Sequence, residues 1–160
     1  MELSAEARAF LDRHAVGHLA TADAAGTPHV VPLCYARVGD RLYFVADDKP
    51  KRRGPRALKR LANIGANPRV ALVVDDYDAD WSRLAYLLVH LDAAVVEDAD
   101  EYAAALAALR QRYPPYRTMP LAPDTHPMVR MTPRRWNLWR SSTTPGGRRA
   151  VGAGGGRRGR

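Results

Sequence analysis

Residues 48–74 place a cationic segment directly before a short helix and an apolar strand, and no other stretch constrains the fold as strongly. Seven of the thirteen residues from Asp48 to Arg60 are Lys or Arg. Helical spacing on one face follows at Leu58, Leu61, Ala62 and Gly65. An Asn-Pro break at residues 67–68 then separates this helix from an apolar run. The pattern predicts a helix over residues 57–65, a strand over residues 69–74 and a cationic turn mounted on a sheet.

The charge density of this turn predicts a site for an anion. The free amide groups and the positive dipole end at a helix start attract a phosphate before any side chain is counted. Arginine adds a planar fork and lysine adds a mobile point charge, and a phosphate suits both. A run of charges is often only a solvated face. A basic turn that binds nothing therefore stays open as the alternative.

The composition favours one domain followed by a basic tail. A chain of 160 residues can bury one sizeable core, and 46% hydrophobic with 26% charged residues is typical of a globular domain. Five arginines and seven of the twelve glycines lie in residues 142–160, and subtracting those five charges from the net +8 leaves +3. We predict a domain over residues 1–141 and a disordered tail over residues 142–160.

Three features predict a soluble cytoplasmic protein. The single cysteine, Cys34, cannot form a disulfide within the chain, which fits a reducing compartment, and we expect it to act as a small buried hydrophobe. Residues 1–10 lack the basic region and apolar core of a signal peptide. No apolar run approaches the roughly 20 residues that a membrane helix needs.

The first half of the chain predicts one helix and three strands. Ser4 can cap a helix whose apolar face carries Ala7, Phe10, Leu11 and His14. Strands are expected over residues 16–22, 29–38 and 41–45, joined as a meander by turns at residues 23–28 and 39–40. Pro32 lacks an amide donor, so it predicts an edge strand, a bulge or an opening of the sheet toward a ligand.

The second half completes a mainly β pattern. We expect a long strand over residues 85–96 and a helix capped by Asp100, with a proline-rich loop over residues 116–127 after it. The apolar stripe of the helix is Tyr102, Leu106, Leu109 and Tyr113, and strand-like segments follow over residues 128–131 and 135–139. Strands grouped in this way, with three helices between or outside them, predict a closed or split antiparallel β-barrel.

No catalytic triad or metal site can be defined from the residues. The aspartates of residues 75–80 lack the glycine and glutamate that complete a calcium loop. The five histidines are too scattered for a zinc site, and each is expected to be structural: His14, His18, His29, His90 and His126. We predict no bound metal.

The chain resembles one family in four consecutive segments. They are DKPK at residues 48–51, LANI at 61–64, NPRVA at 67–71 and DDYDADWSRL at 75–84. The first and last of these are fairly specific, and the likeness runs from about residue 3 to residue 142. The family is the pyridoxamine 5'-phosphate oxidase-like split β-barrel group, and within it the actinobacterial deazaflavin (coenzyme F420)-dependent oxidoreductases. The resemblance implies a homodimer with cofactor sites between its two subunits.

The resemblance also implies which residues contact F420 or FMN. Lys49 and Lys51, with Arg52 and Arg53 beside them, would hold the phosphate. Val30, Val31 and Pro32 would lie against the ring, Trp81 would form an aromatic wall, and Tyr43 or Tyr86 could also reach the ring. Such a cofactor carries the hydride chemistry itself, so the protein need only bind the phosphate, enclose the ring and leave one face open. A plain edge-strand proline and a core-filling tryptophan are the alternatives for Pro32 and Trp81.

Two further residues bear on this hypothesis. The family normally has a glycine where this chain has Leu91, and a glycine within a strand marks a bulge or a close backbone approach. Leu91 therefore implies a narrowed site or a shifted strand. His126 is a candidate proton donor, because its loop could approach the open face of the cofactor, although water would serve equally well.

Three functions remain as hypotheses. The first is an oxidoreductase that transfers a hydride between F420, or FMN, and a small organic substrate. The second is a split barrel that binds flavin, F420 or haem without turnover. The third is a small barrel that binds nucleic acid through its cationic turn and basic tail. Against the third, the aromatic residues are not interleaved with the basic ones.

Overall fold

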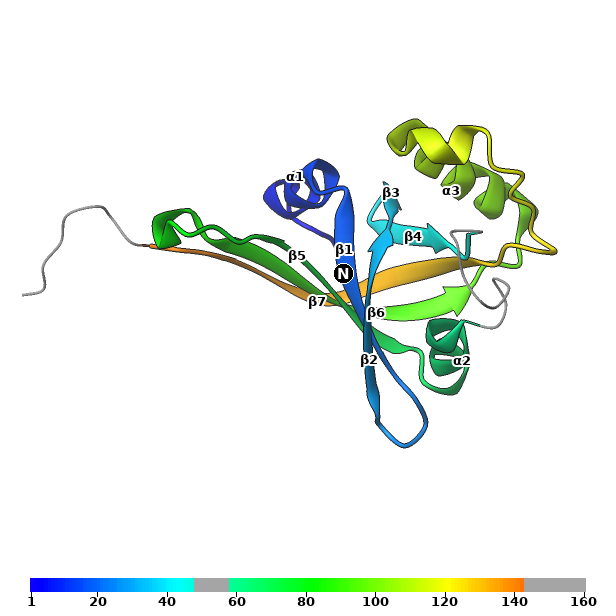
Figure 1. Cartoon of the computed structure of the whole chain (residues 1–160), viewed down its shortest axis with the longest axis horizontal. Coiled ribbons are helices and arrows are strands. Elements are labelled where there is room, and N and C mark those ends of the chain that lie inside the picture. The colour runs from blue at the N-terminus through cyan, green and yellow to red at the C-terminus, as the bar shows by residue number, and fades with distance from the viewer. Residues whose placement is uncertain (48–57, 143–160) are drawn as a thin grey trace, which may run out of the picture.

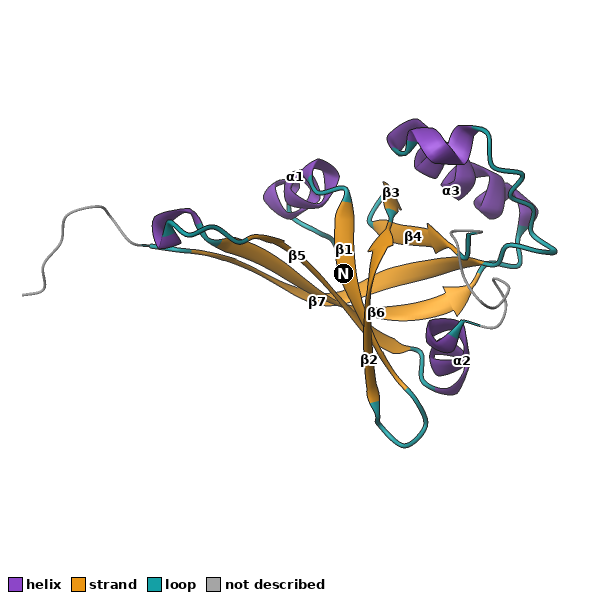
Figure 2. Cartoon of the chain, viewed as in Figure 1, coloured by secondary structure: helices purple, strands orange, loops and turns teal. Residues whose placement is uncertain are grey.

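The computed structural model describes residues 1–47 and 58–142. Its elements are α1 (Ala5–Arg13), β1 (Val16–Ala22), β2 (Pro28–Cys34), β3 (Ala36–Val38), β4 (Arg41–Val45), α2 (Lys59–Ala66), β5 (Arg69–Asp76), the 3₁₀ helix η2 (Trp81–Arg83), β6 (Ala85–Val95), α3 (Ala99–Arg112), the 3₁₀ helix η3 (Pro114–Arg117) and β7 (Met128–Arg140). Figure 2 shows strands at the centre and helices around them. The predicted mainly β fold with flanking helices is confirmed.

The seven strands form one antiparallel sheet in the order β2-β1-β5-β6-β7-β4-β3. The two end strands of this order, β2 and β3, are consecutive in the chain and are separated only by Tyr35. The chain thus joins both ends of the sheet, and the sheet must curl to allow it. Figure 1 shows this curl, with β2 directed away from the long β5–β6–β7 ribbon. The predicted split barrel is confirmed.

Two local predictions are wrong. The strand expected over residues 29–38 is interrupted at Tyr35, because its amide donates to the Tyr113 hydroxyl at 3.0 Å and its own hydroxyl donates to the Leu11 carbonyl at 2.7 Å. Consequently β2 pairs with β1 and β3 pairs with β4. The cap of α3 is Asp98, whose carboxylate accepts from an amide of the first turn at 2.7 Å, whereas Asp100 lies within that turn.

The two segments expected near the C-terminal end are one continuous strand, β7, with a bulge. His90 of β6 pairs with Arg135, but Leu91 pairs with Pro133, so Arg134 is an extra residue on β7. A bulge accommodates a proline that cannot donate to the ladder. This shift in the pairing register lies at Leu91, whose side chain is only 1% exposed and packs in the core.

Two hydrophobic clusters hold the described chain together. The first, which we name the inner cluster, fills the barrel, where alternate residues of β1, β5 and β6 form the inner face of the sheet and meet α1 and α2. Its fully buried members include Leu19, Leu72, Leu87, Val89 and Phe10. The second lies where α3 and η3 pack on β3 and β4. The predicted stripe of Tyr102, Leu106, Leu109 and Tyr113 belongs to this second cluster.

Helix α1 is held by a cap at its N-terminus and by an ion pair to the β3–β4 turn. The Ser4 hydroxyl accepts from the Ala7 amide at 3.1 Å, which confirms the predicted cap. Arg8 donates to both carboxylate oxygens of Asp40, at 2.7 and 3.2 Å, and so ties α1 to the turn between β3 and β4. The Arg8 guanidinium bonded to Asp40 lowers the pKa of that carboxyl group. Helix α1 is therefore held over the inner cluster by an ion pair.

Candidate functional site

The predicted phosphate ligands lie outside the described residues. Lys49, Lys51, Arg52 and Arg53 fall in the range 48–57, so their role stays a prediction. The described chain ends at Asp47 and resumes at Leu58, which directly precedes α2. The surroundings of these two ends therefore define what the cationic segment approaches.

Arg60, in the first turn of α2, has a half-buried side chain beside this gap. Its guanidinium carbon lies 5.7 Å from the centre of the Phe44 ring. Its Nε is buried and has no hydrogen-bond partner among the described residues. Burial lowers the pKa of Arg60, against the opposing effect of the Asp47 carboxylate and Tyr116. A buried donor without an acceptor costs about 1–3 kcal/mol, so Arg60 is suited to an anion that arrives from outside the chain.

The carboxylate of Asp47, which acts electrostatically on Arg60, also accepts a hydrogen bond from Tyr116. The Tyr116 hydroxyl donates to the Asp47 Oδ2 at 2.6 Å, and Asp47 is 3% exposed. Burial, and next the bond to this carboxylate, raise the pKa of Tyr116 far above its ordinary value. Tyr116 thus stays protonated and holds the end of β4 in place beside Arg60.

Helix α2 is bound to the hairpin that contains β2. Lys59 Nζ lies 3.0 Å from Asp23 Oδ2 in the β1–β2 turn. The Asn63 amide donates to the Thr21 hydroxyl at 3.0 Å, and this hydroxyl donates to the His29 carbonyl at 3.3 Å. Figure 1 accordingly shows α2 beside the β1–β2 hairpin. The start of α2 and the strand expected to contact a ring are therefore neighbours.

The pleat of β2 divides the three predicted ring contacts. Val30 and Pro32 are exposed, and Val30 is 60% accessible. Val31, between them, pairs with Leu19, whose side chain fills the barrel. Because successive residues of a strand point to opposite faces, Val30 and Pro32 share the outer face of the sheet and Val31 lies on the inner one. Pro32 stands on the end strand β2, where a missing amide donor is tolerated.

The outer face continues from β2 across the sheet as two lateral rows of paired residues. One row is Pro32, His18, Val73, Leu88 and Asn137, and the other is Val30, Ala20, Ala71, His90 and Arg135. Beside them Tyr86 stacks on Trp139, with ring centres 5.5 Å apart. We name the residues of these two rows, with Tyr86 and Trp139, the outer face. It is a largely apolar surface that no helix of the described chain buries.

The three aromatic candidates lie in three different places. Tyr86 lies on the outer face, as just described. Tyr43 is 3% exposed and donates to Glu101 at 2.7 Å, within the second cluster. Trp81 is 73% exposed in η2, so the alternative that it fills the core is wrong. Figure 1 places η2 at the far end of the β5–β6–β7 ribbon, and the chain does not bring Trp81 to β2 by itself.

His126 is held beneath α3 rather than at the outer face. It is 6% exposed, and its ring Nδ1 lies 2.8 Å from the Thr125 hydroxyl. Its backbone carbonyl accepts from the Tyr102 hydroxyl at 3.0 Å. The chain does not bring this candidate proton donor close to Val30 or Pro32.

Sequence reasoning missed Arg60 as an individual residue, although a signal was present. Arg60 lies three residues before Asn63 and four before Ile64, the two buried residues of α2. Residues at these spacings share one helix face. The apolar stripe predicted from the sequence, which included Ala62 and Gly65, is wrong, because these two residues are exposed. The buried side of α2 carries Asn63 and Ile64, and Arg60 lies on that side.

No cluster of three or more His, Cys, Asp or Glu is arranged to hold a metal within residues 1–47 and 58–142. Over the same residues, no helix combines the length and the apolar character needed to cross a bilayer.

Comparison with known proteins was made on both sequence and structure. The profile of the pyridoxamine 5'-phosphate oxidase family matches residues 3–140. No curated protein matches the chain. Among solved structures, a conserved hypothetical protein, Rv2991 from Mycobacterium tuberculosis, is 21% identical with a TM-score of 0.70, over 88% of this chain and 86% of that one.

Two further structures share the architecture. HutZ, a haem storage protein from Vibrio cholerae, is 18% identical with a TM-score of 0.65, over 88% of this chain and 95% of that one. An F420 reductase is 27% identical with a TM-score of 0.57, over 81% of this chain and 94% of that one. The fold is thus shared over nearly the whole length of these proteins.

Proposed function

Because the chain belongs to the pyridoxamine 5'-phosphate oxidase family, we propose that it is an oxidoreductase that transfers a hydride between F420, or FMN, and a small organic substrate. The observation that carries this proposal is Arg60, a half-buried cation whose Nε has no partner among the described residues. Arg60 follows closely after residues 48–57 in the chain. That segment contains five further basic residues: Lys49, Lys51, Arg52, Arg53 and Arg56. A cofactor phosphate is the anion that this arrangement fits.

Different residues would bind the phosphate and the ring of such a cofactor. Arg60 would bind the phosphate together with Lys49 and Lys51. Val30 and Pro32 provide an exposed apolar surface on the hairpin to which α2 is bound. When bound, F420 or FMN supplies the hydride transfer. The protein's contribution is to hold the phosphate, orient the ring and exclude water from one of its faces. The similarity to an F420 reductase supports F420 as the first choice.

We further propose that two copies of the chain form the complete site. The outer face exposes Val30 and Trp139, at 60% and 42%, beside the stacked Tyr86. Apolar surface of this extent on a small domain marks an interaction site. A symmetric partner would cover the part of this face around Tyr86, Leu88 and Trp139 and enclose a ring that lies on β2, while the end of the face at His90 and Arg135 would stay open. Trp81, at the far end of one chain, could then serve the other chain's site.

Titration of the pure protein with F420 and with FMN, followed by fluorescence, tests this function. Each charge-assisted contact to a phosphate contributes about 1.5–3 kcal/mol, so Lys51→Glu and Arg60→Gln should each weaken binding at least about tenfold. Part of this loss should shrink at high salt. Arg41→Gln removes an exposed cation of β4 that pairs with Glu101 and is the matched control. Unchanged affinity in Lys49→Ala, Lys51→Glu and Arg60→Gln would refute the phosphate site.

A second candidate function is haem binding without turnover. His18 lies on the outer face beside Pro32, and an imidazole on an apolar surface is a suitable axial ligand for haem iron. The shared architecture with HutZ supports this alternative. Absorption spectra with haemin distinguish the two functions, because a histidine-ligated haem gives a Soret band that His18→Ala abolishes. A protein that binds F420 and shows no such band excludes the haem-binding alternative, and oxidation or reduction of the bound F420 by a substrate then distinguishes an oxidoreductase from a protein that only binds the cofactor.

A further inference from the structure

The bulge in β7 places two consecutive arginines on the outer face of the sheet. In a regular strand, Arg134 and Arg135 would point to opposite faces. Here Arg134 is the extra residue of the bulge, and both side chains are exposed. Pro133 before them is buried, and Trp136 after them packs against the inner cluster. The alternation is therefore interrupted at this point, and two cations share one face.

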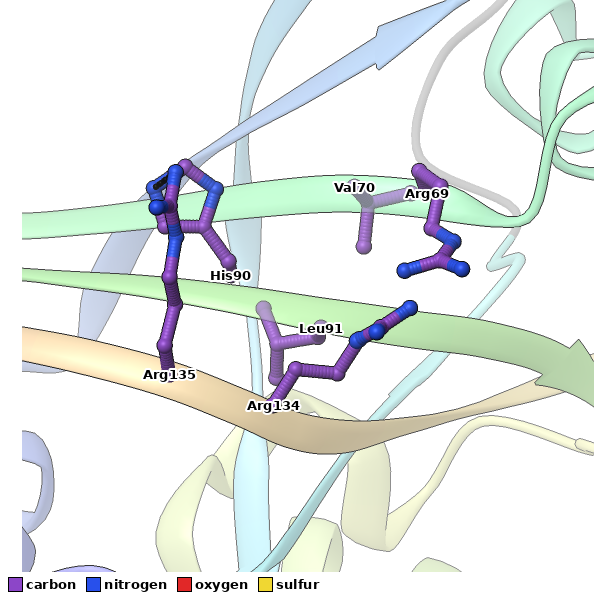
Figure 3. Close-up of a pocket in the computed structure, with 6 residues that line it drawn as sticks. All are labelled: Arg69, Val70, His90, Leu91, Arg134 and Arg135. Carbon is purple, nitrogen blue, oxygen red and sulfur yellow. Dashed lines mark hydrogen bonds between the residues drawn. The ribbon is translucent and has the colours of Figure 1, made fainter. Parts of the chain in front are cut away.

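These arginines line a pocket of about 420 Å³ together with Arg69, His90, Val70 and Leu91. The buried side chains of Val70 and Leu91 belong to the strands beneath it, β5 and β6. Figure 3 shows the guanidinium groups of Arg69 and Arg134 pointing toward each other across β6. The volume lies in the range of about 300–1,000 Å³ that small-molecule sites occupy.

The charges that face this pocket do not balance. One carboxylate, Asp92, serves both Arg69 and Arg134, at 3.3 and 3.5 Å from its Oδ1. Arg135 lies 3.3 Å from His90 Nε2, which can accept its hydrogen bond only as the neutral ring. Three permanent cations are thus opposed by one partly exposed anion.

We propose that this pocket binds a small oxyanion, a phosphate or carboxylate group of a ligand distinct from the cofactor phosphate. Guanidinium groups present planar pairs of N–H donors that match the oxygens of either group. The pocket shares the outer face with the proposed ring contacts Val30 and Pro32, but it is separate from the phosphate site, because Arg60 lies over Phe44, which belongs to the inner cluster. The proposal therefore stands whether or not F420 or FMN binds at Arg60.

The test is an NMR titration of the full chain with inorganic phosphate and, separately, with succinate, at low ionic strength. The ring signals of His90 report on the pocket, and those of His126, which is buried beneath α3, serve as an internal reference. We expect His90 to shift in a saturable manner with at least one of the two anions. The stronger of the two responses identifies phosphate or carboxylate as the preferred group.

Matched variants separate this pocket from general attraction to a basic chain. Arg134→Gln should weaken the anion at least fivefold, while Arg83→Gln should change its affinity less than twofold. Asp92→Asn removes the carboxylate that occupies Arg69 and Arg134, so it should tighten binding. Asp78→Asn, whose carboxylate lies 3.4 Å from Arg83, is the control for that change. No saturable shift of His90, or equal effects of the pocket and control variants, would overturn the proposal.

Discussion

The two faces of β1, β5 and β6 differ much more in exposure than in composition. Leu87 is fully buried in the barrel, while its neighbour Leu88 is half-buried on the outer face beside Val73. An antiparallel sheet with one free face usually carries polar residues there. The outer face of these strands carries the polar residues His18 and His90, but it also carries Ala71, Val73, Tyr86 and Leu88. Both faces of the sheet therefore carry apolar side chains suited to packing, but within the single chain only the inner face is covered.

This difference separates residues that form the fold from residues that remain for binding. The inner face has its partners within the chain, in α1 and α2. The outer face begins with the apolar end strand β2 and ends with the arginines of the β7 bulge. It thus offers apolar surface at one side and cationic groups at the other. Changes on the two faces should have different effects, and adjacent residues of β6 provide a direct comparison.

The largest effect is expected at the inner face. Leu87→Ala removes a fully buried side chain and leaves a cavity, which costs about 2–5 kcal/mol of unfolding free energy. For a domain of this size the melting temperature should fall by roughly 5–20 °C. Chemical and thermal denaturation measure this loss. A change below about 1 kcal/mol would show that the inner face is not the main source of stability.

The adjacent residue on the outer face should affect assembly instead of folding. Leu88→Glu places a charge in the surface that we propose two copies share, while the barrel interior is unchanged. We expect a folded monomer at concentrations where the parent chain is a dimer, with at least a tenfold weaker association. Sedimentation velocity gives the mass, and circular dichroism confirms the fold. A parent chain that is monomeric at high micromolar concentration would contradict the shared site.

The helices and most strands could be predicted because their signals are local. Ser4 caps α1, and the stripe from Tyr102 to Tyr113 forms the buried face of α3, as their spacing indicated. The interruption at Tyr35 could not be predicted, because it depends on Leu11 and Tyr113, which are distant in sequence. The bulge at Arg134 likewise depends on pairing with β6.

The candidate site was only partly accessible to sequence reasoning. The pleat alone assigns Val30 and Pro32 to one face and Val31 to the other, so this division could have been made from the sequence. The half-buried state of Arg60 could be inferred only from its spacing to the apolar Ile64, because the sequence does not show that the polar Asn63 is buried. The approach of Arg69 to Arg134 required the sheet order, because these residues lie on β5 and β7 with β6 between them.

A smaller, pH-dependent effect on stability is expected from the ion pair between Arg8 and Asp40, which holds α1 over the inner face. The Arg8 guanidinium bonded to Asp40 holds the pKa of that carboxyl group below its ordinary 3.8. A lowered pKa in the folded state stabilises the protein above that value, and the stabilisation is lost as the pH falls through the folded-state pKa. Asp40→Asn should therefore lower the melting temperature slightly at pH 7. The difference from the parent should shrink as the pH falls below 3.8 and through the lowered folded-state pKa, where the parent loses the same ion pair. A difference that stays constant down to the lowest pH at which both proteins fold would show that the ion pair is not the cause.

The smallest effect is expected from removing residues 143–160, and it tests whether the outer face is free for a second copy. This segment offers no apolar periodicity that could cover Leu88 or Val30, because it consists mainly of glycine, arginine, threonine and proline. A chain ending at Ser142 should keep its melting temperature, its association state and its affinity for F420 or FMN. Differential scanning calorimetry and sedimentation velocity on the shortened chain measure the first two, and the fluorescence titration measures the third. A loss of several degrees would mean that the tail packs on the body. If the shortened chain also associated more tightly, the tail would be shown to compete with a second copy for the outer face. The outer face would then be free only in the domain without its tail.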